Sequence, residues 1–270
     1  MNTPLNILVG CDPEIFVKKD GQFVSAHGLI KGDKDNPTPV EKGAVQVDGM
    51  ALEFNINPAA TEQEFVGNVE HVMKLLAAMV PGYELAPVPV AHFPLEYIAA
   101  QPREARELGC NPDFNAYTGY ANRKPNANRP MRTASGHIHI GWTEGQNILD
   151  ESHMAACHAV AKQCDIMLGL ASLFYDNDTE RRSMYGQGGC IRYKSYGVEY
   201  RTLSNAWLLT PERMSWVFRN TKKAMEMLFS GNALYQEAEA MGVDIQAIIN
   251  NSDKDAAEPL IRRWNLELVK

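Results

Sequence analysis

Polar and apolar residues alternate strictly in several short stretches of this chain, most clearly in the stretch 189–205. Arg192 and Lys194 fall on one face of an extended strand there. After a turn, Glu199 and Arg201 fall on one face of the next strand. Because strand side chains alternate between the two faces of a sheet, this pattern predicts a hairpin with one charged and one apolar face. A buried charged face needs a partner, such as a metal ion with an anionic ligand, because an unpaired charge out of water is costly.

Three further stretches have the same period of two, and each carries a polar pair backed by apolar residues. The four pairs are Asp12 and Glu14, Glu53 and Asn55, His137 and His139, and Glu199 and Arg201. Any one such pair is more often a solvated strand face than a ligand pair, and a His-x-His motif alone is a weak signal. Four pairs together are much less expected by chance.

These stretches and the turn signals between them define the predicted elements. Strands are expected at 7–17, 22–27, 44–56, 83–90, 136–142 and 190–204, and helices at 62–80, 150–174 and 211–230. The hairpin turns and one-sided strands predict an α+β fold, in which one largely antiparallel curved sheet has helices on its apolar face. The four polar pairs would then line the other face.

Length and composition are those of a globular chain with an ordinary core. The 270 residues carry a formal net charge of −7 and are 45% hydrophobic, and we expect a single domain over 1–270. Residues 231–270 are expected to form a helical C-terminal extension, with helices at 233–241, 244–250 and 253–265. The long polar segment Gly109–Ala134 is expected to be functional or disordered.

The composition also restricts the setting and the partners. No apolar run approaches the roughly 20 residues of a membrane helix, and the N-terminus lacks the basic region of a signal peptide. Five cysteines without a C-x-x-C motif argue against a disulfide scaffold or a cysteine zinc site. A cytoplasmic protein is expected, and the acidic balance argues weakly against non-specific nucleic-acid binding.

The polar pairs predict a metal-assisted site for phosphoryl transfer. Carboxylates so close together repel one another unless a cation lies between them, and oxygen-rich ligands with an occasional histidine suit magnesium or manganese. Arginines suited to a phosphate or a carboxylate occur at 132, 181, 182, 192 and 201. Arg181 and Arg182, however, would by default form a solvated charge run.

Several short motifs resemble a known family when they are taken in order. G-H-I-H-I at 136–140, I-R at 191–192 and E-Y-R at 199–201 resemble the G-x-H-x-H…I-R…E-x-R order of glutamine synthetase-type catalytic domains. The fuller set adds D-P-E at 12–14, L-E-F-N at 52–55 and Y-G-V-E-Y-R-T-L-S-N at 196–205. It resembles the phage-associated carboxylate–amine ligases of type 2, an amidoligase family with a glutamine synthetase-like fold. The resemblance runs from about residue 7 to about residue 230.

The resemblance implies an ATP-dependent ligase that needs Mg²⁺ or Mn²⁺. ATP would phosphorylate a substrate carboxylate, and an amine would displace the phosphate to give an amide. The carboxylate and amine would belong to small molecules or peptides, and the protein would act in the host cytoplasm if it is encoded by a phage.

The resemblance also implies roles for individual residues. Glu14, Glu53 and Glu199 would bind metal, and His137 would lie near a metal and the transferred phosphate. Arg201 would hold the substrate carboxylate or the developing phosphate, and Arg192 would face the nucleotide phosphates. We place Arg132, Arg182 and Lys194 next to the nucleotide. Asp12, Asn55 and His139 are expected to contact the metal-binding side chains rather than the metal.

One departure from the glutamine synthetase pattern concerns its paired-glutamate E-x-E, which is D-P-E at 12–14 here. Pro13 has no backbone N–H, so we expect a strand edge or a bulge at this point. The departure leaves the number of metals open.

Two other functions stay open. A metal-dependent hydrolase also uses His-x-His on a strand but needs further histidines, and after His139 only His153 and His158 follow, both in a predicted helix. The other hypothesis is a non-catalytic phage protein that retained the fold.

Overall fold

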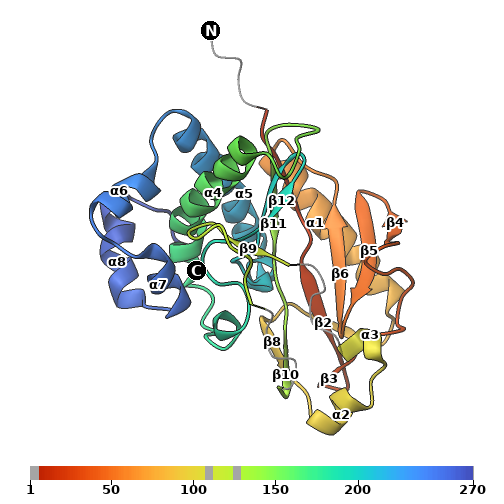
Figure 1. The fold of residues 1–270 in the computed structure, drawn as a ribbon. Coiled ribbons are helices and arrows are strands. Elements are labelled where there is room, and N and C mark those ends of the chain that lie inside the picture. The colour runs from red at the N-terminus through yellow and green to blue at the C-terminus, as the bar shows by residue number, and fades with distance from the viewer. Residues whose placement is uncertain (1–5, 107–111, 124–128, 270) are drawn as a thin grey trace.

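A computed structural model describes residues 6–106, 112–123 and 129–269, and Figure 1 shows its arrangement. The first sheet is antiparallel and has the order β1-β11-β13-β12-β9. Its strands are β1 (Leu8–Cys11), β11 (Ile138–Gly141), β13 (Gly197–Tyr200), β12 (Cys190–Lys194) and β9 (Phe114–Asn115). The hairpin predicted at 190–204 is therefore present as β12 and β13, at the centre of this sheet.

A second antiparallel sheet has the order β3-β2-β6-β5-β4, and β7 also pairs with β2. Its strands are β2 (Glu14–Lys19), β3 (Gln22–Val24), β4 (Thr38–Val40), β5 (Gly43–Asp48), β6 (Ala51–Ile56) and β7 (Glu84–Ala86). The strands β8 (Val90–His92) and β10 (Met131–Thr133) form a separate pair. Antiparallel sheets with helices confirm the α+β class.

The sequence predicts one sheet, whereas the structure divides the strands at Pro13. The expected strand 7–17 is β1 and β2 joined at Asp12 and Pro13, so one chain segment enters both sheets. The amide of Asp12 donates to the carbonyl of His137 (3.3 Å), while the carbonyl of Pro13 accepts from the amide of Phe54 in the other sheet (3.2 Å). Proline has no N–H to donate, so the ladder is interrupted there.

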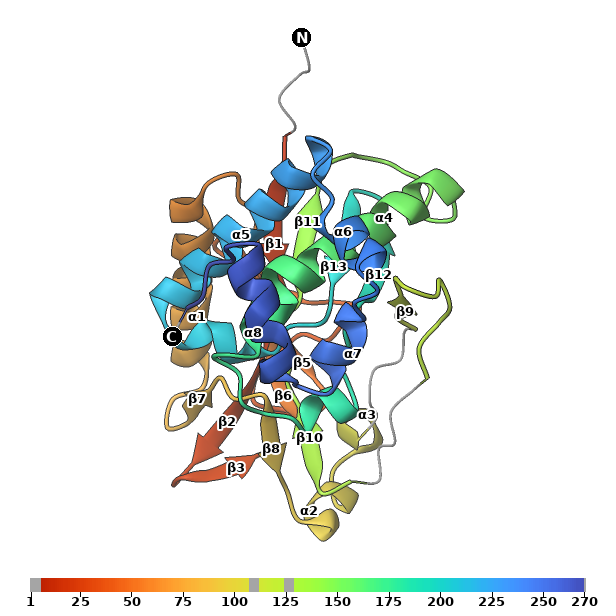
Figure 2. The same cartoon turned by 90° about the vertical axis from the view of Figure 1, so that its left-hand side faces the viewer.

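Three long helices cover the sheets, as the sequence predicts. They are α1 (Glu62–Met79), α4 (Glu151–Cys164), which continues as a π-helix over Asp165–Leu170, and α5 (Pro211–Phe229). Helix α1 packs on β5 and β6, and α4 packs on β12 and β13. Figure 2 looks onto α4 and α5 with β11 and β13 behind them.

The apolar faces of the strands supply the core beneath these helices. Ile138, Ile140, Ile191, Val198 and Tyr200 are all fully buried. They alternate with the polar pairs, as a period of two requires. The polar pairs of β11 and β13 consequently lie on the face of the sheet away from α4.

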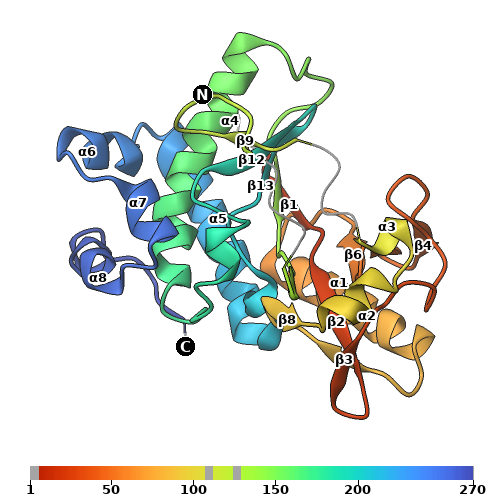
Figure 3. The ribbon, with the colours of Figure 1, turned by 60° about the horizontal axis from the view of Figure 1, so that its bottom comes forward.

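The remaining helices are short. They are α2 (Leu95–Ala99), α3 (Arg103–Arg106), α6 (Leu234–Ala240), α7 (Ile245–Asn250) and α8 (Lys254–Arg263). The last three match the helices expected after residue 231, and Figure 3 shows them on the side of α4 away from the second sheet. In the described part of the chain, no helix is long and apolar enough to cross a membrane. The predicted polar segment 109–134 falls partly outside the described residues, at 109–111 and 124–128.

Gly136 allows two chain segments to meet next to His137. Its amide donates to the carbonyl of Leu203 (3.0 Å), and its carbonyl accepts from Nε1 of Trp207 (3.1 Å). A Cβ at this position would overlap Trp207 Nε1 and the carbonyl of Ser204. The glycine of the G-H-I-H-I motif is therefore required by close backbone packing.

We predict that Gly136→Ala destabilises the protein by about 1–3 kcal/mol, because the added methyl group overpacks a buried contact. Gly67→Ala is the matched control. A Cβ at Gly67 in α1 meets nothing within 4 Å, so alanine should stabilise that helix by about 0.5–1 kcal/mol. Urea denaturation of both variants measures the two changes, and equal stability of Gly136→Ala and wild type would contradict the packing argument.

Candidate functional site

A cleft of about 780 Å³ is lined by residues of both sheets. Its lining includes most of the residues that the sequence singles out: Asp12, Glu14, Glu53, Asn55, Arg132, His137, His139, Arg192, Lys194, Glu199 and Arg201. The polar pairs from four strands thus share one cavity.

Strand register explains why these side chains meet. Arg192 on β12 lies opposite Glu199 on β13, and Glu199 lies opposite His139 on β11. His139 in turn lies opposite Gly10 on β1. Directly opposite residues on one face have Cβ atoms about 5 Å apart, so a single row across the sheet brings a guanidinium, a carboxylate and an imidazole together.

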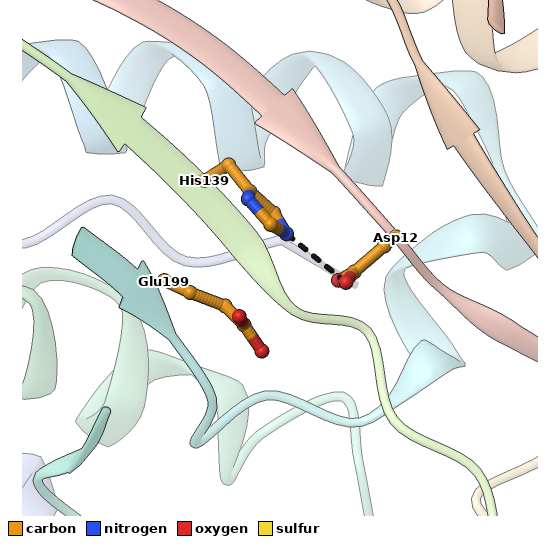
Figure 4. Close-up of side chains that lie close together, drawn as sticks. All are labelled: Asp12, His139 and Glu199. Atoms are coloured by element: carbon orange, nitrogen blue, oxygen red, sulfur yellow. Dashed lines mark ion pairs between the residues drawn. The ribbon is translucent and has the colours of Figure 1, made fainter. Parts of the chain in front are cut away.

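Asp12, which follows β1, forms a candidate metal centre with His139 and Glu199 of this row. Each offers a ligand atom, and the three atoms lie within 4.8 Å of one another. Figure 4 shows the three side chains converging, with His139 Nε2 3.1 Å from Asp12 Oδ2. The other ring nitrogen, Nδ1, contacts the hydroxyl of Tyr196. A second partner of this kind orients an imidazole for metal binding.

Glu199 is a fully buried carboxylate surrounded by cations. Lys194 Nζ lies 2.8 Å from its Oε2, Arg192 Nη1 lies 3.4 Å from its Oε1, and Arg201 pairs with the same Oε1. Burial would raise the pKa of Glu199, but Arg201 and two neighbouring histidines outweigh burial and hold this pKa well below its ordinary value. Glu199 is therefore ionised.

Arg201 is held by protein groups in this structure. Besides Glu199, it contacts the hydroxyl of Tyr185, and its Nη1 lies 3.2 Å from Nδ1 of His137. Its Nε lies 3.7 Å from Asp113 Oδ2, and only 2% of the residue is exposed. A guanidinium with this many partners is fixed in orientation, as a positioning group for an anion requires.

His137 is a neutral base at the edge of the metal centre. Burial and the charge of Arg201 lower its pKa to about 4. Its Nδ1 lies 3.3 Å from Asp12 Oδ1. Within the described residues its buried Nε2 has no hydrogen-bond partner, so this nitrogen is available to a ligand in the cleft.

Glu14 and Glu53 form a second acidic group where β2 pairs with β6, and they are direct cross-strand neighbours. Burial and the charge of Asp48 raise the pKa of Glu14 to about 8, and burial and the charge of Asp12 raise that of Glu53. Their closest donors are neutral: the amide of Ser135 for Glu14 (2.8 Å) and the side chain of Gln46 for Glu53 (2.6 Å). A buried and a half-buried carboxylate with neutral donors fit a divalent cation that binds oxygen.

The remaining predicted residues divide into two groups. Arg132 on β10 lines the cleft and donates to the carbonyl of Met131 (2.8 Å), and burial lowers its pKa. Arg182 does not reach the cleft. It is buried against Asp176, with Nη2 3.2 Å from Oδ2, while Arg181 donates to the carbonyls of Thr202 and Leu203. The Arg181–Arg182 run is neither solvated nor part of the cleft.

Sequence reasoning missed several residues of the cleft or its wall. Gln46 and Asp48 line it, and Tyr185 and Asp113 hold Arg201. The first two could have been found, because they are a fifth polar pair two residues apart on a strand. Asp113 and Tyr185 lie in irregular segments, where no period marks the side chains that face the cleft.

We predict that Glu53→Gln stabilises the metal-free protein, and that the gain is larger at about pH 8 than at about pH 5. The folded-state pKa of Glu53 is raised, so the folded protein keeps a proton that the unfolded chain loses. Wild-type stability therefore falls as pH rises above the unfolded-state pKa. The neutral glutamine avoids this loss, and we expect a difference of about 1–3 kcal/mol.

Melting curves in chelator and in magnesium test this prediction. Magnesium should stabilise wild type and remove the advantage of Glu53→Gln. Glu258→Gln is the control, because Glu258 forms an exposed pair with Arg262 and should behave like wild type. A wild-type protein that gains no stability from magnesium or manganese would contradict the assignment of this acidic pair to a metal.

Comparisons with known proteins add little to this geometry. No family model matches the chain, and no curated protein matches it. Among solved structures, it is similar to a bifunctional glutathione synthetase from Pasteurella multocida, with 12% sequence identity and a TM-score of 0.39. The similarity covers 97% of this chain and 49% of that one, so the chain spans about half the length of the protein it matches. A similarity this weak carries no argument about fold or function, so a functional proposal has to rest on the cleft and on the sequence motifs.

Proposed function

We propose that this protein is an ATP-dependent carboxylate–amine ligase that works with a divalent metal. The observation that carries the proposal is that the cleft contains both an acidic and a basic group of side chains. Glu53 is buried and Glu14 is half-buried, and the hydrogen-bond donors that the described residues give them are neutral, while Arg192, Lys194 and Arg201 gather around Glu199. The first group suits a cation, and the second suits an anion.

The acidic groups are proposed to hold the metal. Asp12, His139 and Glu199 would supply ligands from the first sheet, and Glu14 and Glu53 would supply ligands from the second. Oxygen-rich ligands of this kind suit Mg²⁺ or Mn²⁺. When bound, the metal would neutralise phosphate oxygens and orient the transferred group.

The basic groups are proposed to hold the phosphates and the substrate carboxylate. Transfer of a phosphoryl group brings several negative oxygens into one cleft, and its catalysis is mostly positioning and charge stabilisation. Arg192 and Lys194 would face the nucleotide phosphates, and Arg132 lies in the same cleft. Arg201 would hold the substrate carboxylate or the phosphoryl group. The Nε2 of His137, which has no hydrogen-bond partner among the described residues, would contact the same ligand.

The ligase class is supported by the resemblance of the sequence motifs to amidoligases. ATP would convert a carboxylate to an acyl phosphate with release of ADP. An amine would then attack the acyl carbon, and phosphate would leave as the amide forms. The hydrolase reading fits the cleft less well, because a metal-bound water needs little positive charge besides the metal.

Nucleotide binding and ADP release test this proposal directly. We expect a non-hydrolysable ATP analogue to bind in the presence of magnesium, measured by isothermal titration calorimetry. Continued release of ADP over many turnovers should require carboxylate and amine pools together with magnesium. No detectable nucleotide binding would overturn the proposal and favour the hydrolase or the non-catalytic reading.

We predict that Arg201→Lys lowers carboxylate-dependent ADP release about 100-fold and changes analogue affinity much less. Lysine keeps the charge but cannot replace a planar fork of donors. Arg219→Ala is the control and should retain activity. Arg219 lies on α5 and forms exposed ion pairs with Glu62 and Glu267. Full activity of Arg201→Lys would exclude the bidentate role.

Lys194 provides a separate prediction about the order of binding. Its ammonium occupies the Oε2 of Glu199 that a metal would use, so Lys194→Met should raise the affinity for Mn²⁺ alone about 3- to 10-fold. The same variant should bind the ATP analogue more weakly, because one phosphate contact is lost. Lys162→Met removes a lysine that pairs with Glu239 outside this cleft and should change neither affinity. Weaker Mn²⁺ binding by Lys194→Met would contradict this competition.

A further inference from the structure

A buried carboxylate with no place in the proposed chemistry lies directly behind the strand that carries Glu199 and Arg201. Asp165 is fully buried at the start of the π-helix Asp165–Leu170. π-Helical turns are rare and often occur at functional sites. This one lies where α4 packs against β13, on the face of the sheet opposite the cleft.

The Asp165 carboxylate accepts hydrogen bonds from neutral groups. The hydroxyl of Tyr200 donates to its Oδ1 (2.7 Å). The hydroxyl of Thr202 can donate to the same Oδ1 (3.2 Å) or to the carbonyl of Gln187 (3.1 Å). The hydroxyl of Tyr117 donates to its Oδ2 (2.9 Å). A buried carboxylate without a cationic partner is costly, and its burial raises its pKa to about 7.

Two of these donors bracket Arg201. Tyr200 and Thr202 are its neighbours in sequence, and they point toward the helices because side chains alternate along the strand. Asp165 therefore contacts the residues on both sides of Arg201, from the helix-covered side of the sheet. The backbone amide of Arg201 donates to the carbonyl of Cys190 (2.9 Å), so rotation of this segment would have to break this bond between strands as well as the hydrogen bonds to Asp165.

The third donor connects Asp165 to the acidic partner of Arg201. Tyr117 follows β9, whose Asn115 pairs with Cys190 on β12. Asp113, two residues before Asn115, lies 3.7 Å from Nε of Arg201. The Asp165 carboxylate thus holds both the strand segment of Arg201 and the segment of Asp113, which is one of the acidic partners of Arg201.

We propose that Asp165 is a positioning residue that fixes the orientation of Arg201 in the cleft, through Tyr200 and Thr202 on one side and through Tyr117 on the other. The functional part of this proposal rests on the ligase function proposed above. The structural part depends only on the hydrogen bonds around Asp165.

Native-state hydrogen exchange tests the structural part without any substrate. In Asp165→Asn, one of the donors loses its acceptor, so amides of residues 198–203 should exchange about 10-fold faster than in wild type. The strand β5 in the other sheet should stay within about twofold of its wild-type rate. Tyr200→Phe should accelerate the same amides and serves as the second variant if Asp165→Asn does not fold.

Tyr193→Phe is the matched control for exchange. Tyr193 lies on β12, and its hydroxyl contacts His158 (2.6 Å) rather than Asp165. Loss of this hydroxyl should leave residues 198–203 unchanged. The proposal is overturned if Asp165→Asn and Tyr200→Phe leave these amides at wild-type rates, or if every strand accelerates equally.

A double-mutant cycle separates positioning from general destabilisation. Asp165→Asn should lower the kcat of carboxylate-dependent ADP release at least about 10-fold, while KM for ATP stays within about threefold. In an Arg201→Ala background, the same substitution should change the residual rate by less than about twofold. An equal loss in both backgrounds would mean that Asp165 does not act through Arg201.

The two measurements fail independently. If wild type releases no ADP and binds no nucleotide, the ligase proposal fails and exchange still decides whether Asp165 holds the Arg201 segment. If wild type is an active ligase but Asp165→Asn matches it in kcat and in exchange, the positioning proposal fails and the ligase proposal stands.

Discussion

The burial of Glu199 is the constraint on which the rest of the site depends. A carboxylate with no exposed surface is stable here because Arg201, Lys194 and Arg192 approach it, and removing one partner from a buried ion pair is strongly destabilising. Those cations reach Glu199 only in the observed strand register. The close packing at Gly136 and the hydroxyl contacts behind the sheet therefore support one electrostatic arrangement.

Much of this arrangement follows from the sequence, because a period of two needs no knowledge of strand partners. Alternation correctly places His137 and His139, and also Glu199 and Arg201, on the cleft side of their strands, and it predicts the three long helices. The division into two sheets was not predicted, since it depends on which distant strands pair on each side of Pro13. Such pairing is decided by tertiary contacts that a local pattern does not contain.

The partners that charged residues meet in the fold are a second feature that the sequence does not predict. Arg182 was expected beside the nucleotide, yet it is buried against Asp176, and the amino-acid sequence does not show which acid an arginine will meet. Asp48 is the last residue of β5, and with Gln46 it repeats the period that marks the other pairs. Charge and spacing predict what kind of group a residue needs, and the fold decides which residue supplies it.

The junction at Asp12 and Pro13 has a consequence for how this chain tolerates change. Asp12 belongs to the acidic cluster of the first sheet and Glu14 to that of the second, and both line one cavity. Breaks between strands are usually places where insertions and deletions accumulate. Here a gain or loss of one residue would turn the side chains of one strand to the opposite face. This irregular junction should therefore keep a constant length among related chains.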